Sequence, residues 1–295
     1  MYAAFSSVAD SAITPTPFTC PLTGCQMVID FLFLIKAVSS ISIVVALSLI
    51  AERAGPRVAG LLTGLPLGAG MVIIFTGAEQ GAAFAAASAH HMVPGFVTTA
   101  VFIYLYAAAA ARGRIGGVKG VIVPSLLANG GYALSAWAMS YTTIPLVYAV
   151  PMIAVCLYVT SKLMAYLPNT PIMARVSFGW RVMAFRAGMA TAAILLITGI
   201  AGNVGAQWTG LLTAFPITLY PLILVIHITY TGDEIAAVLK HVPAGLGGVV
   251  SFCVTAAFSL PAMGLLWGTI VAYVAAAVYL LTFSQVSRLW RARRG

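Results

Sequence analysis

The sequence contains few charged residues, and this scarcity excludes most classes of soluble protein. Only 7% of the 295 residues are charged, whereas an ordinary soluble domain carries about a quarter. Such a chain cannot cover a water-exposed surface with polar groups. Hydrophobic residues make up 61% of the sequence, and long apolar runs recur from Val28 onward. Runs of about twenty apolar residues cross a bilayer as helices, so the composition predicts an all-α, polytopic membrane protein.

Motifs for catalysis and for metal or phosphate binding are also missing. The chain contains no GxSxG, no HExxH and no glycine-rich phosphate loop that leads into Lys-Ser or Lys-Thr. Six acidic residues leave little material for acid–base chemistry. We therefore expect no enzyme, no bound metal and no other cofactor. The four cysteines lack the spacing of metal ligands; they are Cys20, Cys25, Cys156 and Cys253.

The net charge of +9 is explained by membrane orientation, because the basic residues are spread over short loops and the C-terminus rather than gathered on one face. We expect no nucleic-acid partner. Cytoplasmic loops of membrane proteins collect Lys and Arg. With the N-terminus outside and the C-terminus inside, the outer loops hold no basic residue, and the inner segments hold Arg53, Arg57, Arg112, Arg114, Lys119, Lys162, Arg175, Arg181, Arg288, Arg291, Arg293 and Arg294.

Glycine, proline and charged clusters divide the apolar sequence into about nine predicted spanning helices. Residues 1–27 lack the basic start and apolar centre of a signal peptide, and we expect a disordered extension there. Pro94 and Pro243 lie within long predicted helices, where kinks are expected. The predicted helices are 28–52, 57–77, 80–111, 118–140, 143–166, 182–202, 206–230, 233–259 and 262–286.

One motif recurs in the two halves of the chain. GLLTGLP at 60–66 aligns with GLLTAFP at 210–216 when the sequence is shifted by 150 residues, and Lys36 then aligns with Arg186. An odd number of predicted crossings separates the copies, so the second copy is inverted relative to the first. The predicted parts are repeat 1 at 28–140, a linker helix and cytoplasmic loop at 141–181, repeat 2 at 182–287 and a basic cytoplasmic tail at 288–295.

Each copy of the motif places a proline within a predicted spanning helix. Proline removes a backbone donor and frees a carbonyl one turn earlier, so we expect a broken helix with unpaired backbone groups near the bilayer midplane. Inverted repeats of secondary transporters form their substrate sites at this depth. The candidate substrate-binding residues are therefore Thr63, Pro66, Thr213 and Pro216. The alternative is that the motif serves close helix packing through its small residues.

Four charged residues are candidates for gates or coupling charges: Lys36, Glu79, Arg186 and Glu234. A charge near the bilayer centre costs ~2.5 kcal/mol or more, so intramembrane charges are functional candidates by default. In a helical hairpin Lys36 and Glu79 approach the same outer boundary, where they can pair. The alternative is that both cations extend to the lipid headgroups and only help orientation.

Other polar residues in the repeats have two interpretations each. His91 and His241 align under the same shift of 150 residues and are candidates for a proton relay, although simple packing is the alternative. The segments TGAE at 76–79 and TGDE at 231–234 have the residue types that cap a following helix. Capping competes with a role for their glutamates as gates.

The run LFLIKAVSSISIVVALSLIAERAGPRVAGLLTGLP, residues 32–66, resembles the GlpM family of small four-helix bacterial inner-membrane proteins. The second copy matches this pattern at Gly210, Leu211, Phe215 and Pro216, with Arg186 in place of the lysine. The resemblance implies a bacterial inner membrane and a link to exopolysaccharide (alginate) production, and it transfers no catalytic residues. The doubled, inverted form is also similar in architecture to the drug/metabolite transporter superfamily. The first copy matches the family pattern at Lys36, Ala59, Gly60, Leu61, Pro66, Glu79 and Gly81.

These features predict a secondary transporter, and more specifically an exporter, that moves a small metabolite by alternating access around a midplane site. Its expected partners are the lipid bilayer and an unknown small molecule, and the sequence is compatible with a homodimer. The alternative is a non-transporting accessory protein for exopolysaccharide or envelope biosynthesis, with the repeats as a packing scaffold.

Overall fold

The computed structural model describes residues 31, 33–46, 65–168 and 179–292, with side chains as far as Val286. The chain divides into two units, Met1–Ile35 and Lys36–Gly295, and only the second is described beyond a few residues. All regular structure in the described ranges is helical, which confirms the all-α prediction.

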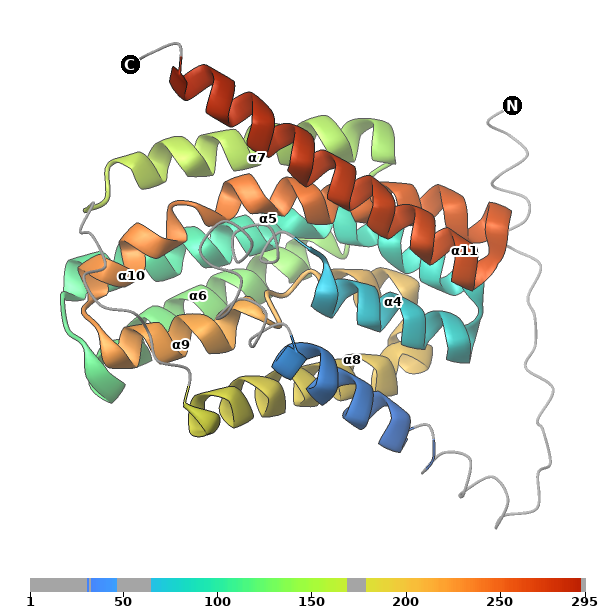
Figure 1. The fold of residues 1–295 in the computed structure, drawn as a ribbon, viewed down its shortest axis with the longest axis horizontal. Coiled ribbons are helices and arrows are strands. Elements are labelled where there is room, and N and C mark those ends of the chain that lie inside the picture. Colours follow the sequence, from blue (N-terminus) through green and yellow to red (C-terminus); the bar gives the residue numbers. More distant parts are fainter. Residues whose placement is uncertain (1–30, 32, 47–64, 169–178, 293–295) are drawn as a thin grey trace. The chain divides into compact units, whose positions relative to one another are not determined.

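The first helix within the described ranges is Phe33–Ala46, which is short and apolar. After it the described residues form eight further helices, which are labelled in Figure 1. They are α4 (Leu67–Gln80), α5 (Ala82–Gly113), α6 (Gly117–Met139), α7 (Leu146–Ala165), α8 (Trp180–Thr213), α9 (Leu219–Thr229), α10 (Gly232–Leu239) and α11 (Val242–Ala292).

Two of these helices, α8 and α11, each consist of two helical pieces joined at a glycine. Gly205 in α8 has φ 78° and Gly264 in α11 has φ 74°. Glycine adopts such positive φ values without the steric cost that a side chain would meet. The chain changes direction at both glycines, and the reversal within α11 is visible in Figure 1. The element α11 therefore contains two crossing-length segments.

In the part of the chain that the structure describes, five helices are long and apolar enough to cross a membrane, namely α5, α6, α7, α8 and residues Val242–Val286 of α11. Phe33–Ala46 and α9 are apolar but shorter. In the most apolar parts of α6 and α7 only 22% and 17% of the residues are buried, and many of the exposed side chains are large and apolar, as lipid-facing helices require. These features support the membrane-embedded protein that the composition predicts.

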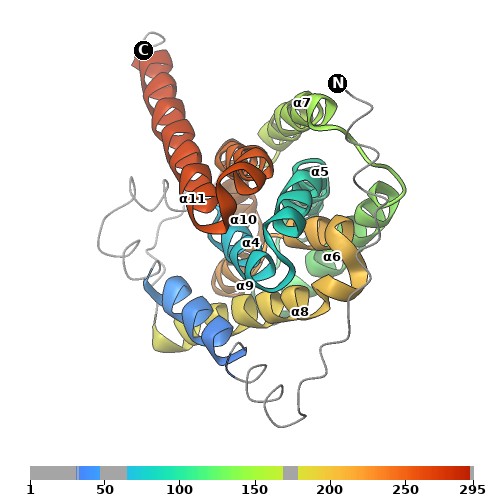
Figure 2. The ribbon, with the colours of Figure 1, turned by 90° about the vertical axis from the view of Figure 1, so that its right-hand side faces the viewer.

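The helix α5 forms the centre of the described structure. It packs against α4, α6, α7, α8, α10 and α11, and Figure 2 shows it among these neighbours. Its sequence is rich in alanine, and small residues allow neighbouring backbones to approach closely. Most of α5 is buried for this reason.

The predicted helix ends agree with the structure to within a few residues for α5, α6 and α7. The predicted helix 206–230 is interrupted between Thr213 and Leu219, where Pro216 predicts a break, and the predicted helix 233–259 is interrupted between α10 and α11. The interruption before α11 directly precedes Pro243, near which a kink is expected. In contrast, α5 continues through Pro94 without a break.

Candidate functional site

The second copy of the motif forms a broken helix at Pro216. The helix α8 ends at Thr213 and α9 begins at Leu219. Between them the Ile217 amide donates to the Phe215 carbonyl at 2.7 Å, which closes a three-residue turn around the proline. The break follows from proline itself, since it has no N–H to continue the helical hydrogen bonds.

The first copy forms the same turn at Pro66. The Leu67 amide donates to the Leu65 carbonyl at 2.9 Å, and Pro66 has φ −79° and ψ 56°, close to an inverse γ-turn. In both copies the proline carbonyl then accepts the first helical bond, from Gly70 at 2.6 Å and from Tyr220 at 2.8 Å. Both prolines are buried. Thr63 lies outside the described residues.

The carbonyls freed at the Pro216 break are bonded by side chains of the protein. The Tyr132 hydroxyl, from α6, donates to the Leu211 carbonyl. The Thr99 hydroxyl, from α5, donates to the Ala214 carbonyl. The Thr213 hydroxyl is buried and donates to Thr209 of its own helix at 2.6 Å. These two carbonyls and the Thr213 hydroxyl therefore have protein partners.

Gly210 of the same motif lies directly against the backbone of α5. A Cβ atom added to Gly210 would lie 2.4 Å from the Ser88 carbonyl oxygen, 2.8 Å from the His91 Cβ and 3.0 Å from the Met92 amide nitrogen. Only glycine fits at such a distance without moving a neighbouring helix. The glycine of the motif therefore serves close packing, as the alternative interpretation expects for this position.

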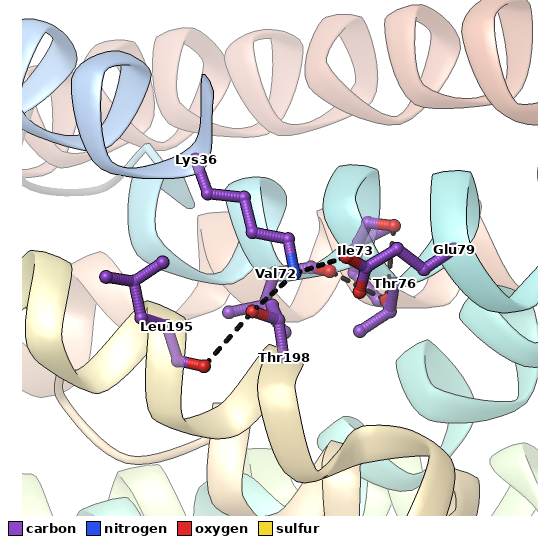
Figure 3. A network of polar contacts seen from close by, with 7 residues as sticks. All are labelled: Lys36, Val72, Ile73, Thr76, Glu79, Leu195 and Thr198. Carbon is purple, nitrogen blue, oxygen red and sulfur yellow. Dashed lines mark hydrogen bonds and ion pairs between the residues drawn. The ribbon is translucent and has the colours of Figure 1, made fainter. Parts of the chain in front are cut away.

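Lys36 forms an ion pair with Glu79 (Figure 3). Its Nζ lies 2.6 Å from Glu79 Oε1 on α4 and donates to Thr198 Oγ1 on α8 at 3.0 Å. The same nitrogen lies 5.9 Å from the centre of the Phe75 ring. Lys36 is only 7% exposed. The pairing expected from the hairpin is thus present, and Thr198 joins it from α8.

The segment TGAE does not cap the helix that follows it. Thr76 lies within α4 and donates to the carbonyls of Val72 at 2.7 Å and Ile73 at 3.3 Å (Figure 3). The residue before α5 is Gly81, with φ 92° and no side-chain cap. The capping interpretation is therefore wrong for 76–79.

The segment TGDE does cap α10. The Thr231 amide and hydroxyl donate to Glu234 Oε2 at 2.7 and 3.1 Å, which forms a capping box. The neighbouring Asp233 pairs with Arg114, whose Nε lies 3.4 Å from Asp233 Oδ2. Glu234 therefore has a local structural role, and Asp233 is the acidic residue that connects α10 to the end of α5.

The other predicted residues lie on α8, on α5 and between α10 and α11. Arg186 is partly buried in α8. His91 is partly buried in α5, with its ring edge toward His90 at a centroid distance of 5.2 Å. His241 is exposed between α10 and α11. Among the described residues, no hydrogen bond joins His91 to His241.

His227 is a buried polar residue to which the sequence assigns no role. Its Nε2 donates to the Ile115 carbonyl at 3.0 Å, so its Nδ1, 3.0 Å from the Tyr106 hydroxyl, accepts from that tyrosine when the ring is neutral. Tyr220, also in α9, accepts a bond from the Asn129 amide at 3.1 Å. A histidine in an apolar run is the only sequence signal, because its partners lie more than a hundred residues away.

An apolar groove lies between the first helix and the start of α8. It has a volume of about 420 Å³. No group of three or more His, Cys, Asp or Glu suited to a metal occurs within the described ranges. The groove is lined by Ile41, Val45, Trp180, Met183, Ala184, Ala187 and Gly188.

Comparisons of the chain with protein-family models, with curated protein sequences and with solved structures find no match. The resemblance to the GlpM family and the similarity to drug/metabolite transporters therefore stay predictions from the sequence.

Proposed function

We propose that the chain is a nine-span secondary transporter of a bacterial inner membrane, built from two inverted repeats, which exports a small molecule by alternating access. The N-terminus is outside and the C-terminus inside in this proposal. One observation carries this proposal. Residues at equivalent positions of the two repeats contact opposite ends of the linker helix α7.

The two ends of α7 are bound by equivalent residues of the two repeats. His90 Nε2 lies 3.1 Å from the carbonyl of Ile144, just before α7 begins. Lys240 Nζ donates at 2.6 Å to the carbonyl of Leu167, just after α7 ends. Residues 90 and 240 are related by the shift of 150. Equivalent residues that bind opposite ends of one helix support repeats that run in opposite directions.

A second pair of equivalent contacts supports the same relation. His227 in α9 bonds to Ile115 in the connection between α5 and α6. The equivalent positions, Gly77 and Leu265, are also neighbours, since a Cβ on Gly77 would lie 2.3 Å from Leu265 Cδ1. The first contact is polar and the second apolar, although the positions in the fold correspond.

Helix boundaries recur with the same shift. The range of α5, Ala82–Gly113, corresponds to Gly232 through Met263, which α10 and the first piece of α11 cover. Each range is followed by a residue with positive φ, Arg114 at 52° and Gly264 at 74°. If α9 is counted with the second piece of α8, and α10 with the first piece of α11, the described helices fit a nine-span arrangement.

The contacts between connections fit the proposed topology. At the outer end, Gln207 Nε2 donates to the carbonyls of Ser140 and Thr142 at 3.0 and 3.2 Å. At the inner end, Arg114 pairs with Asp233. Each contact joins two connections to which the positive-inside rule assigns the same side of the membrane, which supports the proposed topology.

Alternating access requires a closure at each end of the central site. The outer closure is the pair of Lys36 and Glu79 with Thr198, and the inner closure is His227 with Ile115 and Tyr106. Each closure lies toward the far end of a helix that follows one of the turns, since α4 runs from the Pro66 turn to Glu79 and α9 runs from the Pro216 turn to His227. Because both closures consist of a few polar contacts, each can open while the other stays closed.

The test is the accessibility of a cysteine at Thr213 in a variant without the four native cysteines. His227→Leu weakens the inner closure, so we expect faster labelling from the cytoplasmic side and slower labelling from the outside. Glu79→Gln weakens the outer closure, so we expect the opposite change. A membrane-impermeant maleimide applied to right-side-out and inside-out vesicles measures both rates. Equal rates in both variants would contradict alternating access.

One observation favours the accessory protein as a second candidate. The carbonyls at the Pro216 break are bonded by Tyr132 and Thr99, so the break is satisfied without a ligand. A packing scaffold needs no more than this. In that case a cysteine at position 213 stays unlabelled from both sides in every folded variant.

A further inference from the structure

The ammonium group of Lys36 lies in a setting built from three different kinds of group. A carboxylate oxygen of Glu79 lies 2.6 Å away, the hydroxyl oxygen of Thr198 lies 3.0 Å away, and the Phe75 ring centre lies 5.9 Å away. These groups come from α4 and α8, whereas Lys36 belongs to the first helix. Figure 3 shows the lysine reaching between the two helices.

Each of the three groups is complementary to an organic ammonium ion. A carboxylate supplies charge-assisted acceptance, a hydroxyl oxygen supplies a lone pair, and the face of an aromatic ring attracts a cation. The Thr198 hydroxyl directs its hydrogen toward the Leu195 carbonyl at 3.4 Å, which leaves its lone pairs for the ammonium. These three groups together are therefore specific for a primary ammonium group rather than for positive charge alone.

An anion would find a much poorer setting at the same place. Lys36 is the single cation in the cluster, so an anion that displaced the Glu79 carboxylate would have only this one cationic partner. It would also face the same aromatic ring, which attracts cations. A cation that replaces the Lys36 ammonium would contact the same three groups that already bind an ammonium. The chemistry thus favours a cationic ligand.

We propose that Glu79, Thr198 and Phe75 form a binding site for the primary ammonium group of a small organic cation, and that Lys36 occupies this site as an internal ligand. Glu79 is 23% exposed, so the carboxylate can be reached from solvent at the end of α4. This inference names the substrate class of the proposed transporter and rests on that proposal only for its physiological use.

Displacement of Lys36 would release the first helix from α4 and α8. Binding of a cation would then be coupled to opening of the outer closure, since both use the same contacts. A tethered competitor also weakens the apparent affinity for an external ligand, because the binding-competent state is only partly populated. Removal of the lysine side chain should therefore strengthen binding.

The test uses propylamine, which replaces the three carbons and the nitrogen that Lys36→Ala removes. We expect the midpoint of thermal unfolding of Lys36→Ala in detergent to rise with propylamine, with an apparent affinity at least tenfold tighter than in the unmodified protein. The matched controls are 1-propanol, which lacks the charge, and the double variant Lys36→Ala/Glu79→Gln. An equal response to propanol, an equal response of the double variant, or no response would overturn the proposal.

Lys36→Ala leaves the partly exposed carboxylate of Glu79 without its partner, so it can fail to fold by itself. The variant is then produced and purified with propylamine and, in parallel, with 1-propanol. Recovery of folded protein only with the amine supports the site, and equal failure in both overturns it.

This experiment is independent of the transport test, because it measures binding in detergent rather than movement of an accessible face. If propylamine binds while Thr213→Cys labelling stays unchanged, the ammonium site stands and alternating access fails. If labelling shifts as expected while propylamine does not bind, only the ammonium site fails.

Discussion

Replacement of Gly210 by alanine is expected to lower the free energy of unfolding by about 3 kcal/mol, at the upper end of the range for overpacking. The added Cβ would lie 2.4 Å from the Ser88 carbonyl oxygen and 3.0 Å from the Met92 amide nitrogen. Both are backbone atoms of α5 and cannot turn aside as a side chain can. The helix carrying the motif would have to move away from α5, which is the centre of the packing.

Gly199→Ala provides the matched control on the same helix. No atom lies within 4 Å of a Cβ added at Gly199, and alanine within a helix is more favourable than glycine by roughly 0.5–1 kcal/mol. Thermal unfolding in detergent should therefore show a clear loss for Gly210→Ala and none for Gly199→Ala. Equal stability of the two variants would contradict the close approach of α5 to the motif.

Replacement of Glu79 by alanine is expected to lower the free energy of unfolding by about 3 kcal/mol, because it leaves the ammonium of Lys36 buried without its carboxylate. Lys36 is 7% exposed and its side chain lies between two helices. The loss is measured by thermal unfolding in the same detergent. Removal of both charges by Lys36→Met with Glu79→Leu should recover most of it, since no buried charge then lacks a partner.

Arg114→Gln is the control for an ion pair at the surface. Arg114 pairs with Asp233, but its side chain is 74% exposed, and exposed pairs contribute less than about 1 kcal/mol. A loss for Glu79→Ala no greater than that for Arg114→Gln would contradict a buried role for the Lys36 pair.

The positions of several helices could be predicted because the residues that end them lie at the helix ends in the sequence. The connection between α5 and α6 carries Arg112, Arg114 and a run of glycines, and such residues end an apolar helix wherever it is placed. The same holds for the break at Pro216, since proline lacks the amide that would continue the helix. These helix ends and this break depend only on residues that are neighbours in the sequence.

The partners in the candidate site could not be predicted in the same way. Tyr132 and Thr99 bond the carbonyls freed at the break, but they lie 79 and 115 residues away from them. Neither residue stands out from other hydroxyls in apolar helices. Thr198 likewise reaches Lys36 across 162 residues, so the third member of that cluster depends on how α8 packs.

The two copies of TG-x-E illustrate why local pattern alone misleads. Thr231 caps α10 with Glu234, whereas Thr76 lies within α4 and Glu79 reaches Lys36. In the first copy Gly81 ends one helix and begins the next, so the threonine is left inside the helix. The same four-residue pattern therefore gives a cap in one repeat and an ion pair in the other.

The most direct test of the inverted repeats is the sidedness of two equivalent positions. Gly113 and Met263 are separated by the repeat shift, and both are exposed at the ends of equivalent helices. Each is replaced by cysteine in the background without native cysteines and labelled with an impermeant maleimide. The account predicts that Gly113→Cys reacts only from the cytoplasmic side and Met263→Cys only from the outside. Labelling of both from the same side would contradict it.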